Sequence, residues 1–198
     1  MSRATNHYFM VQFVKILEYE LNPENEDVFK YLCELTKQVI DPPSKAPGKL
    51  ELIADVALCS PLRRSVECLK ENAEIEYIPM RELREIPFDL EKICSREEMD
   101  REGDAIVRRN FKKAFIEDRL LTPRKELFEE TKKVLNLCQK LSRQGKTVAV
   151  VSHSFRLKLI EAFLNTRGEL EKNPKLIENY IFDDKKTYEF GEGFFFDV

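Results

Sequence analysis

The 198-residue sequence has little of what marks several large classes of protein. No apolar run approaches the ~20 residues that a transmembrane helix needs, and the first residues, 1–6, are polar with no signal-peptide segment. The sequence contains neither an internal repeat nor a low-complexity tract. Lys and Arg number 33 against 36 Asp and Glu, which is not the basic excess of nucleic-acid binders. We therefore expect a soluble protein that crosses no membrane and binds no nucleic acid.

Cysteine pairing is also missing from the sequence. The five cysteines are odd in number and widely scattered, and none of them forms a Cys-x-x-Cys pair. This pattern argues against a disulfide scaffold or a zinc site, and favours buried free thiols in a reducing compartment. The histidines and carboxylates show no metal-ligand spacing either. We therefore expect no metal, no cofactor and a cytoplasmic location.

What the sequence does contain is an alternation of apolar strands and amphipathic helices. Strands are predicted over 8–14, 52–59, 75–80 and 147–152, and the last of these has the near-continuous apolar pattern of a central parallel strand. Helices are predicted over 24–40, 62–70, 95–119, 123–144 and 155–165. Ser95 and Glu98 form a capping box for the long charged helix over 95–119, and Thr122 and Pro123 begin the next helix. The alternation predicts an α/β fold with a mainly parallel sheet, and the aromatic tail predicts an added edge strand.

Charged and polar residues follow the predicted strands. In open α/β sheets, ligands bind outside the carboxyl ends of the strands, where helix N-termini point at them. Lys15 follows the first strand, Arg64 the second and Glu85 the third, while His153 and Ser154 follow the fourth. Positive charge beside a histidine suits an anion, and phosphate above all. The sequence therefore predicts a phosphate-sized pocket at this edge of the sheet.

Three of these strand ends resemble motifs of the histidine phosphatase superfamily, the phosphoglycerate mutase-like group. Segment 150–153 (VVSH) resembles the motif of the second histidine, and segment 57–65 (ALCSPLRRS) resembles the SSPLxRA turn, with Arg64 at the phosphate-binding arginine. Segment 83–88 (LREIPF) resembles the LxExxFG segment, with Glu85 at the general acid. The motifs come in the family's order. The resemblance implies a three-layer α/β/α sandwich in one domain, 1–198, with a helical cap-like insertion at 91–122.

The family's first motif, R-H-G-E-T-x-x-N, is changed in this sequence. Segment 15–22 (KILEYELN) aligns with it through Glu18 and Asn22. In this alignment Lys15 stands for the arginine and Ile16 for the nucleophilic histidine. Leu17 stands where glycine would let the backbone approach a phosphate. The one other histidine, His7, precedes the expected first strand, too early to reach the pocket. The resemblance therefore implies a domain that has lost the phosphohistidine mechanism.

The leading interpretation is a domain that still binds a phosphorylated small molecule or phosphopeptide, through Lys15, Arg64, His153 and Ser154. Losing a covalent nucleophile costs on the order of a millionfold in turnover, whereas each charge-assisted hydrogen bond to a phosphate still contributes ~1.5–3 kcal/mol. One alternative is an active phosphomonoesterase or phosphomutase, in which His153 or a water activated by Glu85 attacks phosphorus. The other is a non-catalytic interaction or structural module.

Other charged residues near the motifs are interpreted more simply. Arg63 and Lys158 are predicted to be solvated. The charged face of the helix over 95–119 is also predicted to be solvated, and binding of an acidic substrate by this face is the alternative. Glu85 lies among other charged residues, so a surface ion pair is an alternative to its role as an acid.

Overall fold

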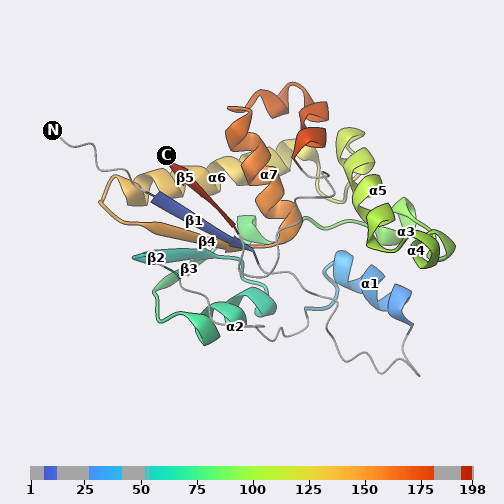
Figure 1. Ribbon diagram of the computed structural model, residues 1–198, viewed down its shortest axis with the longest axis horizontal. Helices are drawn as coiled ribbons and strands as arrows, with labels where there is room; N and C mark the ends of the chain where they lie inside the picture. Colours follow the sequence, from blue (N-terminus) through green and yellow to red (C-terminus); the bar gives the residue numbers. More distant parts are fainter. Residues whose placement is uncertain (1–6, 13–26, 42–51, 53, 181–192, 198) are drawn as a thin grey trace.

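The computed structural model describes residues 7–12, 27–41, 52, 54–180 and 193–197. Their central element is a five-stranded sheet of order β3-β2-β4-β1-β5 (Figure 1). The strands are β1 (His7–Gln12), β2 (Val56–Cys59), β3 (Tyr77–Pro79), β4 (Val148–Ser152) and β5 (Gly193–Asp197). The first four run parallel to their neighbours, and β5 pairs antiparallel with β1 at one edge. The predictions of an α/β fold, a mainly parallel sheet and a C-terminal edge strand are confirmed.

Helices pack on both faces of this sheet. All five residues of β4 are buried, as the valine-rich pattern predicts. Val148 and Val150 contact apolar residues of α6 (Arg124–Ser142) and α7 (Ser154–Asn165), whereas Ala149 and Val151 contact those of α2 (Arg63–Asn72). Because successive strand side chains point to opposite faces, α2 lies on one side of the sheet and α6 and α7 on the other (Figure 1).

A second apolar core lies beside the sheet. It is built by α1 (Val28–Thr36), α3 (Leu90–Ile93), α5 (Asp104–Ile116) and the short 3-10 helices η3 (Glu169–Glu171) and η4 (Pro174–Asn179), with contributions from α6 and α7. At its centre the rings of Phe111 and Phe155 stack with centroids 4.0 Å apart, and Phe88 meets Phe111 edge-on at 5.2 Å. Aromatic contacts of this kind hold α5 firmly against the start of α7.

The single long helix predicted over 95–119 is wrong, because the chain forms two helices there. α4 (Arg96–Glu102) ends at Gly103, whose φ is 64°, and α5 begins at the next residue. Glycine adopts positive φ without strain, so it allows the chain to turn between the two helices. The capping box is confirmed, since the Ser95 hydroxyl accepts the Glu98 N–H at 3.2 Å and the Glu98 carboxylate accepts the Ser95 N–H at 2.8 Å.

The cysteines and the helices bear on two further expectations. All five cysteines are free and buried, which confirms the prediction of buried thiols. Within the described part of the chain, no helix combines the length and the hydropathy needed to cross a bilayer.

Candidate functional site

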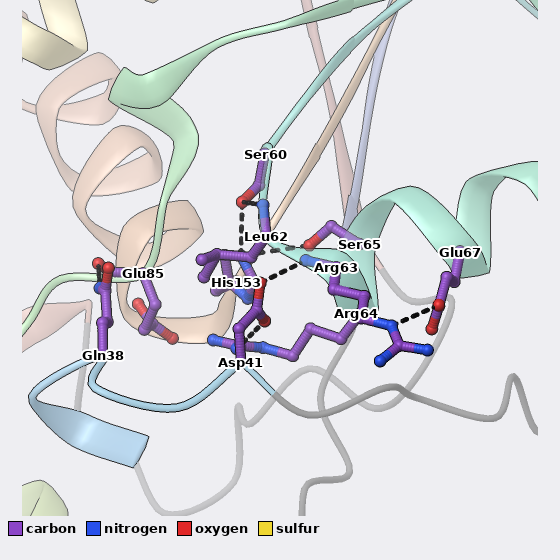
Figure 2. A network of polar contacts seen from close by, with 10 residues as sticks. All are labelled: Gln38, Asp41, Ser60, Leu62, Arg63, Arg64, Ser65, Glu67, Glu85 and His153. Atoms are coloured by element: carbon purple, nitrogen blue, oxygen red, sulfur yellow. Dashed lines mark hydrogen bonds and ion pairs between the residues drawn. The ribbon is translucent and has the colours of Figure 1, made fainter. Parts of the chain in front are cut away.

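Two neighbouring parallel strands bring the main site residues together. β2 is followed by Ser60 and then α2, and β4 is followed by His153 and then α7. The Ser60 N–H donates to the carbonyl of Val151 at 2.9 Å, which extends the ladder between the strands to their carboxyl ends. As a result, Nε2 of His153 lies 2.8 Å from the Ser60 hydroxyl and 3.1 Å from the Ser65 hydroxyl (Figure 2). Both serines and the histidine have no exposed surface.

His153 is a neutral imidazole in a positive environment. Burial lowers the pKa of His153 well below its usual range, and the charges of Arg64, Arg156 and Arg84 lower it further. Its Nδ1 atom is buried and has no hydrogen-bond partner among the described residues. A neutral imidazole has one donor and one acceptor nitrogen, so Nε2 forms its hydrogen bond with a serine hydroxyl in either tautomer.

Arg64 is held near His153 by its position in the first turn of α2. Its side chain is only 6% exposed, and its Nη1 lies 3.2 Å from Oδ1 of Asp41. The other oxygen of Asp41 accepts the backbone N–H of Arg63 at 2.6 Å, at the N-terminus of α2. The side chain of Arg63 points away, toward Glu67, and is exposed as predicted (Figure 2). Asp41 therefore neutralises Arg64 and the helix terminus together.

Glu85, after the 3-10 helix η2 (Arg81–Leu83), lies at the N-terminus of α7. Its Oε1 accepts the backbone N–H groups of Ile86 at 2.9 Å and Arg156 at 3.1 Å, and Oε2 accepts that of Phe155 at 3.4 Å. Burial raises the pKa of Glu85, while these hydrogen bonds and the charges of Arg64 and Arg156 oppose the rise. The contacts are those of a helix-capping carboxylate, and the role of general acid stays a prediction.

The two helix N-termini at the site thus each hold a carboxylate of the chain itself. A helix N-terminus carries partial positive charge and unpaired N–H groups, which is why anions bind there. Asp41 occupies that position at α2, and Glu85 occupies it at α7. A phosphate that enters the site must therefore displace one of these carboxylates or bind beside it.

Arg156 is a buried cation of the site that the sequence motifs did not mark. It is 2% exposed, its Nη2 lies 2.8 Å from Oε2 of Glu130, and its Nε donates to the carbonyl of Arg84 at 2.9 Å. Its remaining Nη1 has no hydrogen-bond partner among the described residues.

Lys158, two residues further along α7, was expected to be solvated, and this prediction is wrong. It is 4% exposed and pairs with Glu161 at 3.0 Å.

The structure brings together three of the predicted site residues, Arg64, Glu85 and His153. Ser154 is the first residue of α7, next to His153. Lys15, Ile16 and Leu17 lie outside the described residues. His7 was expected before the first strand but is the first residue of β1, and the pocket lies at the strands' carboxyl ends.

Sequence reasoning missed the partners that complete the site. Ser60 and Ser65 lie inside the segment 57–65 that resembles the family turn, so their hydroxyls were a usable signal. Asp41 lies between the helix predicted over 24–40 and the strand predicted over 52–59, and nothing local marks it as the partner of Arg64. No group of three or more His, Cys, Asp or Glu side chains in the described part of the chain is placed to hold a metal ion.

Comparisons of the chain with protein-family models, with curated proteins and with solved structures found no match. The chemistry of the site is therefore inferred from its own geometry. The charges of Arg64, Arg156 and Arg84 act on a neutral imidazole that contacts two hydroxyls. Guanidinium groups bind phosphate and carboxylate oxygens in bidentate fashion, so the arrangement favours binding an oxyanion.

Proposed function

We propose that this protein binds a phosphate-containing ligand at the carboxyl ends of β2 and β4, as a histidine-phosphatase-like domain that lacks the phosphohistidine mechanism. The ligand is a phosphorylated small molecule or a phosphopeptide. The observation that carries the proposal is the burial of Arg64 beside His153, two residues from separate motifs that resemble one family. The three-layer α/β/α sandwich of that family is part of the proposal, and the helices on both faces of the sheet support it.

Exchange of Asp41 for a phosphate on Arg64 is energetically favourable. The contact between them is a single one at 3.2 Å, and the Asp41 side chain is 34% exposed. Ion pairs with an exposed partner contribute about 0–1 kcal/mol, whereas a hydrogen bond to a charged group contributes about 1.5–3 kcal/mol. We therefore expect a phosphate that makes two bonds to the guanidinium to compete with Asp41 for Arg64.

The phosphate also changes the protonation of His153. In the free protein three arginines disfavour the imidazolium. A bound dianion reverses this effect, because an opposite charge within a few ångströms raises the pKa of a histidine. Phosphate binding is then coupled to proton uptake by His153 in the pH range where the imidazole titrates.

Loss of the usual catalysis follows from two features. Ile16 stands in the sequence where the resembled family has its nucleophilic histidine. Glu85, at the general-acid position, has both carboxylate oxygens engaged by backbone N–H groups. A general acid must deliver a proton to the leaving group. Burial raises the pKa of Glu85 and favours its protonated form, but the contacts with backbone N–H groups hold both oxygens at the start of α7 and not toward a leaving group.

A phosphomonoesterase or phosphomutase is the second candidate, and one contact favours it. The Ser60 hydroxyl lies 2.8 Å from Nε2 of His153, within the range of a nucleophile and its general base. In this mechanism His153 takes the proton of Ser60 as the Ser60 oxygen bonds to phosphorus, the ester bond breaks, and the imidazolium returns the proton to the leaving alcohol. Water then hydrolyses the phosphoserine and releases phosphate. The burial of both groups in the free protein weighs against this mechanism.

Calorimetric titration with inorganic phosphate and vanadate tests the proposal. The native protein should bind with millimolar to micromolar affinity, and Arg64→Ala should abolish the heat. Arg63→Ala is the matched control, because the neighbouring side chain is exposed and pairs with Glu67. Absence of binding by the native protein, or equal loss in the two variants, would show that the proposal is wrong.

Hydrolysis of p-nitrophenyl phosphate separates the two candidates. Under the leading proposal the native protein and the variants His153→Ala and Ser60→Ala all stay at background. Turnover that disappears in both variants would instead establish the phosphatase and assign Ser60 as its nucleophile.

We also propose a cytoplasmic location. It is supported by the five thiols, which are all free and buried, since reducing compartments keep such cysteines unpaired. Expression with a fluorescent tag and fractionation of the cells tests it.

A further inference from the structure

A groove of about 300 Å³ lies between α5 and η4, and it shares no residue with the site described above. α5 contributes four side chains on one helical face, with the spacing i, i+3, i+4 and i+7, and its C-cap residue Glu117 adds a fifth. η4 contributes two more, three residues apart. The lining residues are Arg109, Lys112, Lys113, Ile116, Glu117, Lys175 and Glu178.

The walls of this groove are anchored by the apolar core. On the opposite face of α5, Phe111, Ala114 and Phe115 have no exposed surface, and neither does Ile177 of η4. All four belong to the same buried cluster. The backbones that carry the lining side chains are therefore fixed relative to each other, so the groove exists before any ligand binds.

The charge of the groove is opposite to that of the whole chain. Four cationic and two anionic side chains line it, which gives 4 − 2 = +2, whereas the formal net charge of the protein is −3. Lys113 and Lys175 form no ion pair with any residue that the structure describes. Arg109 pairs with Glu102 at 2.6 Å, outside the groove. Positive charge concentrated in a concave surface attracts anions.

Helix stabilisation accounts for only part of this arrangement. Cations near a helix C-terminus interact favourably with the helix dipole, and Lys113 is in the last turn of α5. Arg109, a turn earlier, is accounted for by its ion pair with Glu102. Neither reason extends to Lys175 at the start of η4, where the dipole favours anions. A ligand with several negative charges accounts for the placement of Lys113 and Lys175 on one groove.

We propose that this groove binds a small organic polyphosphate. The volume is at the lower end of the range for small-molecule sites, about 300–1,000 Å³. Lys112 and Lys113 line the groove from α5 and Lys175 lines it from η4, so one ligand with several phosphate groups can contact cations of both elements. Glu117 and Glu178 also line the groove, and their negative charge disfavours nucleic acids and long acidic peptides. The proposal is independent of phosphate binding at Arg64.

The test is calorimetric titration of the full chain with inositol hexakisphosphate and pyrophosphate as probes, at low and at physiological salt. The variant Lys113→Glu with Lys175→Glu should bind inositol hexakisphosphate at least roughly tenfold more weakly, because two attractions become repulsions. Lys140→Glu is the matched control, an exposed lysine on α6 whose reversal adds the same kind of charge. It should bind as the native protein does.

Each outcome of this titration either supports or overturns the polyphosphate proposal. Loss in the double variant together with retention in Lys140→Glu supports it, provided that circular dichroism shows both variants folded. Absence of binding by the native protein, equal loss in the control, or retention in the double variant would overturn it. Binding that is retained in the double variant and lost in Arg64→Ala would assign the polyphosphate to the other site. Preference for an acidic peptide over the polyphosphate would also overturn the proposal.

Discussion

Oε1 of Glu85 accepts the backbone N–H of Arg156 at 3.1 Å, which places a carboxylate at the N-terminus of α7, next to His153. The position suits a bound anion, and the chain supplies one itself. Asp41 does the same at α2, where it pairs with Arg64. A ligand phosphate at this site therefore competes with two built-in carboxylates.

Glu85→Gln should lower stability and raise phosphate affinity. The neutral amide has one acceptor oxygen in place of two, so the free energy of unfolding should fall by about 1–2 kcal/mol. Affinity for phosphate should rise several-fold, because a negative charge leaves the site. Urea unfolding and calorimetry measure the two effects. Glu82→Gln is the control, since Glu82 forms only a 3.6 Å contact with exposed Lys133. Weaker phosphate binding by Glu85→Gln would mean that Glu85 assists the ligand instead.

His153 should make stability depend on pH. Its pKa is lowered in the folded protein, so the unfolded chain binds the proton more readily. Stability from this group is complete above about pH 6.5 and falls below it, by up to ~1.4 kcal/mol per pH unit. Urea unfolding between pH 7.5 and 5 should show this slope, and His153→Gln should remove it. The raised pKa of Glu85 acts with the opposite sign, so the comparison with the variant isolates the histidine.

Two further measurements test whether His153 causes the pH dependence of stability. A His7→Gln control shows which of the two histidines carries the slope. The NMR signal of His153 should also stay that of a neutral ring below pH 6.5, and phosphate should shift its titration upward. A His153 that titrates at its ordinary pKa would contradict both the slope and its burial among arginines.

Breaking the buried pair of Arg156 and Glu130 should be costly. Their side chains are 2% and 15% exposed, and removal of one partner from a buried pair costs about 3–5 kcal/mol. Arg156→Met should approach this loss, and Arg156→Met with Glu130→Gln should recover part of it. Arg101→Met is the control, because that arginine is 65% exposed beside Glu102 and such pairs contribute at most about 1 kcal/mol. Equal losses in the two methionine variants, measured by chemical denaturation, would contradict the prediction.

Restoring the first motif should create phosphatase activity. Ile16→His, together with Lys15→Arg and Leu17→Gly, restores the residues that the resembled family uses there. Release of phosphate from a generic phosphomonoester should rise above background and should disappear when His153→Ala is added. If the triple variant stays inactive while it still binds phosphate, the alignment of segment 15–22 with the family motif is wrong.

Local sequence was sufficient for the strands and for most of the longer helices. The valine-rich segment predicted β4, because a continuous apolar run suits a strand buried on both faces. The capping box of Ser95 and Glu98 likewise lies within four residues. The break at Gly103 was overlooked, although a glycine inside a helical pattern is itself a local signal.

The composition of the site was decided by tertiary structure. The motifs marked Arg64, Glu85 and His153, and the packing of β2 beside β4 brought these residues together. The pairing of Asp41 with Arg64, the burial of Lys158 and the groove between α5 and η4 join segments with no common local pattern. Periodicity and caps act over one or two turns of chain, whereas these contacts depend on how whole elements pack. For that reason the sequence by itself determined the strands, the helices and a candidate phosphate-binding edge, and only the tertiary structure decided which charges meet there.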